Sequence, residues 1–170
     1  MLMGLPENIA EIFHNALAGP ACSPPPVRYP FNMPSLLSSR LRGAMELASR
    51  PSQFDGDFNT CGARYGIDPK LLKAVGVWES GLNPGAFNRE VGATGIMQVS
   101  ATSGTTPSTN PGENICQGAA ILRQFLNKSN GNMYLALARY NGGYVHPNFA
   151  YASNVLDVYK ATNIQSTGSI

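Results

Sequence analysis

The carboxyl group of Glu79 is the side chain in this sequence with the strongest case for chemistry. At about 100° per residue it falls on the same side of a helix as Leu72 and Val75. A solvated carboxylate would instead be expected on the side of Lys70 and Lys73. Burial disfavours the charged form of a carboxyl group and raises its pKa. Glu79 is therefore predicted to hold a proton near neutral pH and to act as a general acid.

A helix is predicted to position this carboxyl group. Asp68 is a typical N-cap, and Pro69 suits the first position of a helix. Gly81 can take the left-handed conformation that commonly ends one. A glutamate at a helix end can also turn aside into a salt bridge or cap an amide, so the position of Glu79 alone leaves those roles open.

Amide and aromatic side chains, which sugar-binding grooves require, follow in two later stretches. The stretch GIMQ ends in Met97 and Gln98, and the stretch RYNGG carries Tyr140 and Asn141 at a predicted helix end. Their glycines allow a closely approaching backbone, and the amides can both donate and accept hydrogen bonds. Each residue also has a structural interpretation: Met97 as core filler, Tyr140 as packing and Asn141 as a helix cap.

Composition limits the classes of protein that fit. The chain has 170 residues, 43% of them hydrophobic, which is enough for one domain with a core. The net charge is +2 with scattered basic residues, so no nucleic-acid partner is predicted. No apolar run reaches the roughly 20 residues of a transmembrane helix. The N-terminus lacks a basic region and a continuous apolar stretch, so no classical signal peptide is predicted.

The cysteines and histidines do not have the spacing of a metal site. No CxxC or HExxH motif occurs, so neither a metal nor another cofactor is predicted. Cys61 and Cys116 both lie in predicted helical segments and could be bridged if the fold brings them together. Two separate buried thiols are the alternative, and the residues alone leave both open.

The chain changes character near residue 60. Residues 1–59 are predicted to be an N-terminal arm with two short amphipathic helices and a proline-rich linker at 23–34. The apolar positions of these two helices are Ile9, Ile12, Phe13, Ala16 and Leu17, and then Leu37, Leu41, Ala44, Met45 and Ala48 after a cap at Ser35. Residues 60–161 are predicted to be a mainly α domain, with a polar loop at 83–112 that could build a site. A short β-hairpin could lie within 91–99, and residues 162–170 are a tail.

The order of four motifs is the most specific feature of the sequence. ESGLNPGAFNREVGATGIMQV, NICQGAAILRQFL, ALARYNGG and YASNVLDVY follow one another between about residues 60 and 160. This order resembles the catalytic domain of the family 1 lytic transglycosylases, the soluble lytic transglycosylase or goose-lysozyme-like group. The resemblance implies a mainly helical, lysozyme-like fold with a cleft. It also implies cleavage of the β-1,4 bond between N-acetylmuramic acid and N-acetylglucosamine in peptidoglycan glycan strands, without a cofactor.

The resemblance also implies roles for residues of these motifs. Glu79 is matched to the glutamate of the family's ES motif, which acts as the acid and then as the base. The positions implied to bind substrate are Ser80, Met97, Gln98, Tyr140, Asn141 and Tyr151. Small relatives that serve secretion machines carry a bonded cysteine pair, which Cys61 and Cys116 resemble.

Three positions depart from the family pattern. Ile96 replaces a leucine, Gly142 replaces an alanine, and Arg139 stands where the family has a small residue before the tyrosine. None of these changes removes a reactive group. Arg139, however, is predicted to alter the groove beside the sugar.

The number of available acids bears on the mechanism. A standard glycosidase uses two carboxylates, and Glu90 is the only serious second candidate; a solvated loop charge is its alternative role. One acid suffices if the substrate's own hydroxyl attacks and a 1,6-anhydro ring forms. The alternatives are a goose-type lysozyme that uses water, and a non-catalytic structural module. The apolar faces of the arm's helices are expected to lie on the catalytic domain or on another protein. A partner in a phage virion or secretion machine is favoured, with action at the bacterial cell wall or periplasm.

Overall fold

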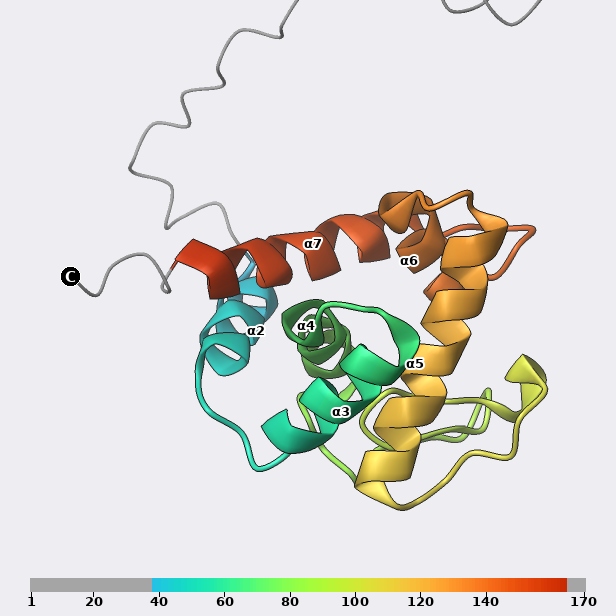
Figure 1. Ribbon diagram of the computed structural model, residues 1–170, viewed down its shortest axis with the longest axis horizontal. Coiled ribbons are helices and arrows are strands. Elements are labelled where there is room, and N and C mark those ends of the chain that lie inside the picture. The colour runs from blue at the N-terminus through green and yellow to red at the C-terminus, as the bar shows by residue number, and fades with distance from the viewer. Residues whose placement is uncertain (1–37, 165–170) are drawn as a thin grey trace, which may run out of the picture. The chain divides into compact units, whose positions relative to one another are not determined.

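The computed structural model describes residues 38–164 (Figure 1). The predicted amphipathic helix between residues 9 and 17 and the proline-rich stretch at 23–34 lie outside the described residues. So do residues 165–170 of the predicted tail, whereas residues 162–164 continue the last helix.

The described residues are mainly helical, which confirms the predicted fold class. Two-residue strands form one small antiparallel sheet, and a single 3-10 turn follows it. The elements are α2 (Ser39–Ser49), α3 (Asp55–Tyr65), α4 (Pro69–Ser80), β1 (Phe87–Asn88), β2 (Ala93–Thr94), η1 (Ala101–Ser103), α5 (Pro111–Lys128), α6 (Met133–Gly142) and α7 (Phe149–Ile164).

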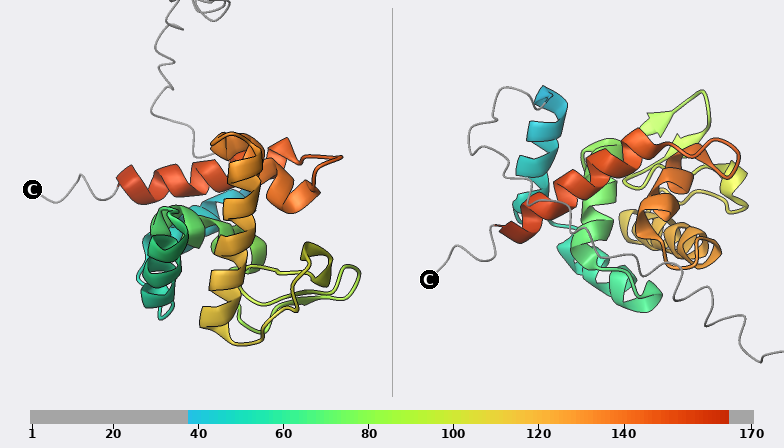
Figure 2. Two further views of the ribbon diagram at one scale, coloured as in Figure 1. Left: turned by 45° about the vertical axis from the view of Figure 1, so that its right-hand side comes forward. Right: turned by 90° about the horizontal axis from the view of Figure 1, so that it is seen from above.

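Helix α4 lies in the middle of these elements and contacts α2, α3 and α7 (Figures 1 and 2). The predicted caps are confirmed: the Asp68 side chain accepts a hydrogen bond from the backbone N–H of Lys70, and Pro69 is the first helical residue. Gly81 ends the helix with a φ of 64°, in the left-handed region. Most of α4 is buried, including Leu72 and Val75 at 0% exposure. The helix that carries Glu79 is therefore held on several sides.

Helix α2 is part of the same core. Leu41, Ala44 and Ala48 are buried in it, and α2 contacts both α4 and α7. The helix begins at Ser39, because the Ser38 hydroxyl accepts a hydrogen bond from the N–H of Leu41, a later start than the cap predicted at Ser35. Of the two supports expected for the helices of the predicted arm, residues 1–59, α2 uses the domain, and the expected boundary after residue 59 falls inside α3. The apolar face of α2 thus packs on α4 and α7.

The loop between α4 and α5 contains the short hairpin. Phe87 pairs with Thr94 and Asn88 with Ala93, and Thr94 also bridges to Val99. Only the second strand lies within the predicted range of 91–99. Further backbone hydrogen bonds, such as the one from the N–H of Gly95 to the carbonyl of Ala86, close this segment on itself.

A disulfide joins α3 to α5. The sulfur atoms of Cys61 and Cys116 are 1.98 Å apart, and their Cα atoms are 4.9 Å apart. The bond closes a loop that contains α4 and the hairpin. Such a bond restricts the unfolded chain, which is expected to stabilise the unit by about 2–4 kcal/mol.

Between residues 38 and 164, no helix is both long and apolar enough to cross a membrane. In the same range, no group of three or more His, Cys, Asp or Glu side chains is placed to hold a metal ion.

Candidate active site

The carboxyl group of Glu79 lies half-buried at the last turn of α4. The Tyr151 hydroxyl, from α7, donates a hydrogen bond to its Oε1 atom at 2.7 Å. Glu79 takes part in none of the three ion pairs found among the described residues. The alternative role in a salt bridge is therefore not the one that the structure shows.

Burial raises the pKa of Glu79 from 4.5 to about 7, as the sequence predicted in direction. Two weaker influences act in the opposite direction: the hydrogen bond from Tyr151 and the positive charge of Arg40 both favour the carboxylate. A group with this pKa is present in both protonation states near neutral pH. It can therefore donate a proton and later accept one.

Two tyrosines beside Glu79 remain protonated. Burial and the nearby charge of Glu79 raise the pKa of Tyr140 and Tyr151 well above 10. The Tyr140 hydroxyl donates to the carbonyl oxygen of Met97 at 2.9 Å. Both hydroxyl groups thus act as donors, and Tyr140 links α6 to the turn that precedes Gln98.

The turn at residues 95–98 is fixed by side chains from two helices. Asn114 of α5 accepts a hydrogen bond from the N–H of Met97, and its own amide donates to the carbonyl of Thr94. Gly95 has a φ of 79°, and a Cβ atom there would lie 2.6 Å from Asn114. Ser80 ties the end of α4 to the turn by donating to the Ile96 carbonyl at 2.9 Å. This arrangement explains why a glycine and a buried asparagine are needed here.

Gln98 presents its amide to the cleft in a defined orientation. Its Nε2 atom donates to the backbone carbonyls of Gly95 at 2.9 Å and Ala86 at 3.3 Å. Because both partners are acceptors, the NH₂ group must face them, and the side-chain oxygen is left for a ligand. The backbone of Gln98 has a φ of 46°, which is uncommon for a non-glycine residue.

A cleft of about 590 Å³ runs from Glu79 between the hairpin, α5 and α6. Its lining combines amides, hydroxyls and aromatic rings with a few charges. Members of each kind are Glu79, Gln98, Ser100, Phe125, Lys128, Arg139, Tyr140, Asn141 and Tyr144. The size and mixed chemistry of the cleft suit a sugar chain, which presents hydroxyl edges and apolar ring faces.

Asn141 lies where the cleft meets a second depression beside α7. Its Oδ1 atom accepts a hydrogen bond from Asn148 at 2.9 Å. The amide nitrogen of Asn141 is therefore available to donate to a ligand's carbonyl or hydroxyl oxygen.

The departure at Arg139 changes one wall of the cleft. Its Nη1 atom donates to the carbonyl of Lys128 and the hydroxyl of Ser129 at the end of α5. Its guanidinium carbon lies 5.0 Å from the centre of the Tyr144 ring. Arg139 lines the cleft as well, so it both fixes the end of α5 and adds positive charge there.

The prediction for Met97 needs a correction. Its side chain is 0% exposed and packs against Gly118, so it cannot touch a sugar. It fills the core, and only its backbone serves the site, through Tyr140 and Asn114. Ser80 likewise acts through hydrogen bonds to backbone atoms, although it lines a depression next to Glu79.

The second acid candidate lies elsewhere. Glu90 is exposed in the hairpin loop, where its N–H donates to the side chain of Asn88. Glu90 does not line the 590 Å³ cleft, whose lining contains Glu79 as its carboxylic acid. The structure thus brings one carboxyl group to this cleft.

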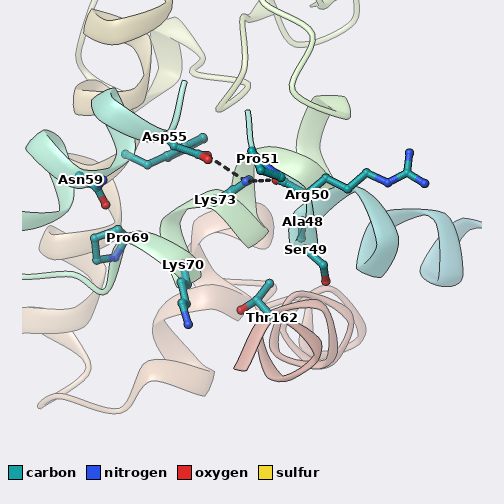
Figure 3. A pocket seen from close by; sticks show the side chains of 11 residues that line it. Ala48, Ser49, Arg50, Pro51, Asp55, Asn59, Pro69, Lys70, Lys73 and Thr162 are labelled. Carbon is teal, nitrogen blue, oxygen red and sulfur yellow. Dashed lines mark hydrogen bonds and ion pairs between the residues drawn. The ribbon is translucent and has the colours of Figure 1, made fainter. Parts of the chain in front are cut away.

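Lys73 also differs from its predicted environment. It is 8% exposed, and Figure 3 shows its ammonium group between Asp55 and Arg50. The distances are 2.8 Å to Asp55 Oδ1 and 2.6 Å to the Arg50 carbonyl oxygen. Of the two lysines on the side expected to be solvated, Lys73 is therefore covered by the end of α2 and the start of α3, whereas Lys70 stays exposed.

Arg40 and Trp78 were not predicted as site residues. Arg40 of α2 and Trp78 of α4 both line two depressions that Glu79 also lines. An arginine in an amphipathic helix gives no signal by itself, because most such charges are solvated. Asn114 could have been predicted as a residue that holds the site in place, because an amide within an apolar helical stretch usually has buried hydrogen-bond partners.

Comparison with known proteins agrees with this geometry. The model of the transglycosylase SLT domain matches residues 57–155. A transglycosylase of Enterobacteria phage PRD1 is 39% identical over 85 residues, covering 48% of this chain and 31% of the phage protein. The chain thus spans about a third of the length of that curated relative.

Proposed function

Because the chain belongs to the transglycosylase SLT domain family, we propose that it is a peptidoglycan lytic transglycosylase. It cleaves the β-1,4 bond between N-acetylmuramic acid and N-acetylglucosamine. The observation that carries this proposal is the single carboxyl group in the cleft, Glu79, whose pKa burial raises to about 7.

Glu79 first acts as the acid. The Tyr151 hydroxyl donates to Oε1, so the proton resides on Oε2 and passes from there to the glycosidic oxygen. The bond from the sugar's C1 atom to that oxygen breaks, and the N-acetyl group of muramic acid stabilises the positive charge at C1. Burial of Glu79 lowers the cost of holding the proton until this step.

Glu79 then acts as the base. Its carboxylate accepts the proton of the 6-hydroxyl group, and the freed oxygen attacks C1 of the same sugar. The product is a 1,6-anhydro ring, Glu79 is protonated again, and no water is consumed. One carboxyl group is sufficient for both steps because the substrate supplies the nucleophile.

Fixed dipoles assist the charged intermediate. The side-chain oxygen of Gln98 faces the cleft, because backbone carbonyls occupy its NH₂ group. Tyr140 also lines the cleft, and its hydroxyl group donates a hydrogen bond to the Met97 carbonyl, which leaves the lone pairs of its oxygen for the intermediate. Oxygen atoms held in this way stabilise developing positive charge without reorganising.

The products of digestion test this route against hydrolysis. Mass spectrometry of fragments released from purified sacculi is expected to show 1,6-anhydromuramic acid ends, lighter by one water molecule than hydrolysed ends. Hydrolysed ends alone would identify a lysozyme-type hydrolase, and no released fragments would support a non-catalytic module.

The biological setting is proposed to be local wall penetration by a phage particle or a secretion machine. Support comes from the similarity to a phage transglycosylase. Residues 1–37 are proposed to hold the partner protein. Antibody detection in purified particles tests the virion setting, and presence only in fractions of a secretion apparatus would favour the other.

A further inference from the structure

A cation from outside the matched family region lies beside the carboxyl group of Glu79. Arg40 belongs to α2, whereas the family match begins at residue 57. Arg40 and Glu79 line the same two depressions, and the positive charge of Arg40 lowers the pKa of Glu79. The mechanism above gives Arg40 no task.

Trp78 holds the guanidinium group of Arg40 in place. Nη2 of Arg40 donates to the backbone carbonyl of Trp78 at 3.1 Å, and its guanidinium carbon lies 4.4 Å from the centre of the Trp78 ring. A cation over an indole ring is attracted by the ring's electron density. These two contacts fix the position of the guanidinium group, although Arg40 as a whole is exposed.

The charge of Arg40 is not neutralised by a contact within the described residues. The ion pairs found there join Glu46 with Arg50, Asp55 with Lys73, and Asp157 with Lys160. The guanidinium group has five N–H donors, and the bond to Trp78 uses one of them. The remaining donors suit a carboxylate, which can accept two parallel hydrogen bonds.

Two depressions next to Glu79 are both lined by Arg40 and Trp78. One, of about 320 Å³, continues to Asn141, Asn148 and Asn154, and the other, of about 460 Å³, continues along α2. The hairpin, α5 and α6 form the main cleft instead. Because Glu79 lines all three spaces, a glycan strand cleaved there can extend from the cleft towards Arg40.

We propose that Arg40, anchored on Trp78, binds a stem-peptide carboxylate of peptidoglycan on the far side of the scissile bond from the main cleft. This inference rests on the proposed function. Stem peptides carry free carboxylates along an otherwise uncharged glycan, and Arg40 supplies the complementary charge. Arg40 is therefore a specificity residue, and α2 completes the substrate site.

Kinetics on soluble peptidoglycan fragments test this role. Arg40→Gln can still donate a hydrogen bond to the Trp78 carbonyl but has no charge. Because the charge of Arg40 lowers the pKa of Glu79, the comparison is made near pH 5, where Glu79 is protonated in both proteins. There the KM of the variant is expected to rise about tenfold and its kcat to stay within twofold of the wild type, because the lost contact binds the substrate and the transition state equally. Fragments whose stem-peptide carboxylates have been converted to amides should show wild type and Arg40→Gln with equal KM.

Arg50→Ala is the matched control. Arg50 also carries a positive charge, at the end of α2, but its side chain pairs with Glu46 and lines the space near Lys73 instead. Its KM should equal that of the wild type on both substrates. Arg40→Gln with an unchanged KM on the intact fragments, or an equal rise on the amidated fragments, would overturn the proposal.

Binding to a catalytically inactive background separates this inference from the proposed function. Calorimetry with Glu79→Gln and the double variant Glu79→Gln/Arg40→Gln measures affinity for the intact fragments without turnover. The double variant is expected to bind about tenfold more weakly, and equal affinities would refute a role for Arg40. If the wild type forms no anhydro product while this difference in affinity persists, the proposed reaction fails and the binding site stands.

Discussion

Lys73 and Glu79 are two ionisable residues on the same helix, and they differ in the hydrogen-bond partners that the fold gives them. Lys73 has a carboxylate and a carbonyl within 2.8 Å, supplied by Asp55 at the start of α3 and by Arg50 at the end of α2 (Figure 3). Glu79 has a neutral phenol as its hydrogen-bond partner, and burial raises its pKa to about 7. The lysine is satisfied by the fold, whereas the glutamic acid is left to exchange its proton.

The difference lies in the partner that each buried group has in the folded protein. A buried charge that finds a well-placed opposite charge stays ionised and connects the elements that hold the pair. A buried acid given only a neutral donor favours its protonated form. Helix α4 therefore carries both a buried ion pair and the proposed catalytic acid, and substitutions at the two positions should affect different properties.

The largest expected effect is the loss of turnover in Glu79→Gln. The amide keeps the acceptor for the Tyr151 hydroxyl but cannot transfer a proton, so the rate of anhydro-product release should fall at least about 1000-fold. Circular dichroism and thermal unfolding are expected to remain close to the wild type. Activity within tenfold of the wild type would remove Glu79 from the mechanism.

The next effect concerns stability. Lys73→Met removes the donor for Asp55 and the Arg50 carbonyl, so urea unfolding should show a loss of about 2–4 kcal/mol. Turnover per folded molecule should stay within twofold. Lys160→Met, which removes an exposed ion pair with Asp157, is the matched control and should cost less than about 0.5 kcal/mol. Similar losses in both variants would mean that the Lys73 pair has no special structural role.

The sequence predicted the chemical side of this comparison better than the structural side. The period of α4 placed Glu79 with Leu72 and Val75, and the caps at Asp68 and Gly81 fixed where the helix ends. Local signals of this kind depend on few neighbours, so they can be interpreted from the sequence.

The burial of Lys73, the position of Arg40 and the choice between the two roles of Met97 could not be predicted in the same way. The first two depend on which distant segment covers α4, and α2 belongs to the predicted arm. For Met97 the sequence left two roles open, substrate binding and core filling, and the packing of its side chain against Gly118 of α5 decides for the core. Tertiary contacts decide these cases, and local patterns do not contain them.

A smaller effect is expected in the pH profile. The acid step needs protonated Glu79, so kcat/KM should fall as the pH rises through about 7. The hydrogen bond from Tyr151 favours the carboxylate, so Tyr151→Phe should raise the pKa of Glu79 further and move this fall to higher pH. The rate below pH 6 should drop about tenfold, because the carboxyl group is less well positioned.

Tyr140→Phe is the comparison for this profile. It removes a hydroxyl group bonded to Met97 instead of Glu79. Its fall in kcat/KM should stay near the pH of the wild type, whatever its effect on the rate. A fall that moves to lower pH in Tyr151→Phe would contradict the assigned hydrogen bond.

The most direct test is a titration of Glu79 itself. Carbon-13 NMR of the side-chain carboxyl group, assigned by its loss in Glu79→Gln, reports the protonation state without substrate. A midpoint of about 7 is expected, because burial outweighs the hydrogen bond from Tyr151 and the charge of Arg40. A midpoint near the ordinary value of 4.5 would show that the group is ionised at neutral pH, and Glu79 could not serve as the acid in the way described.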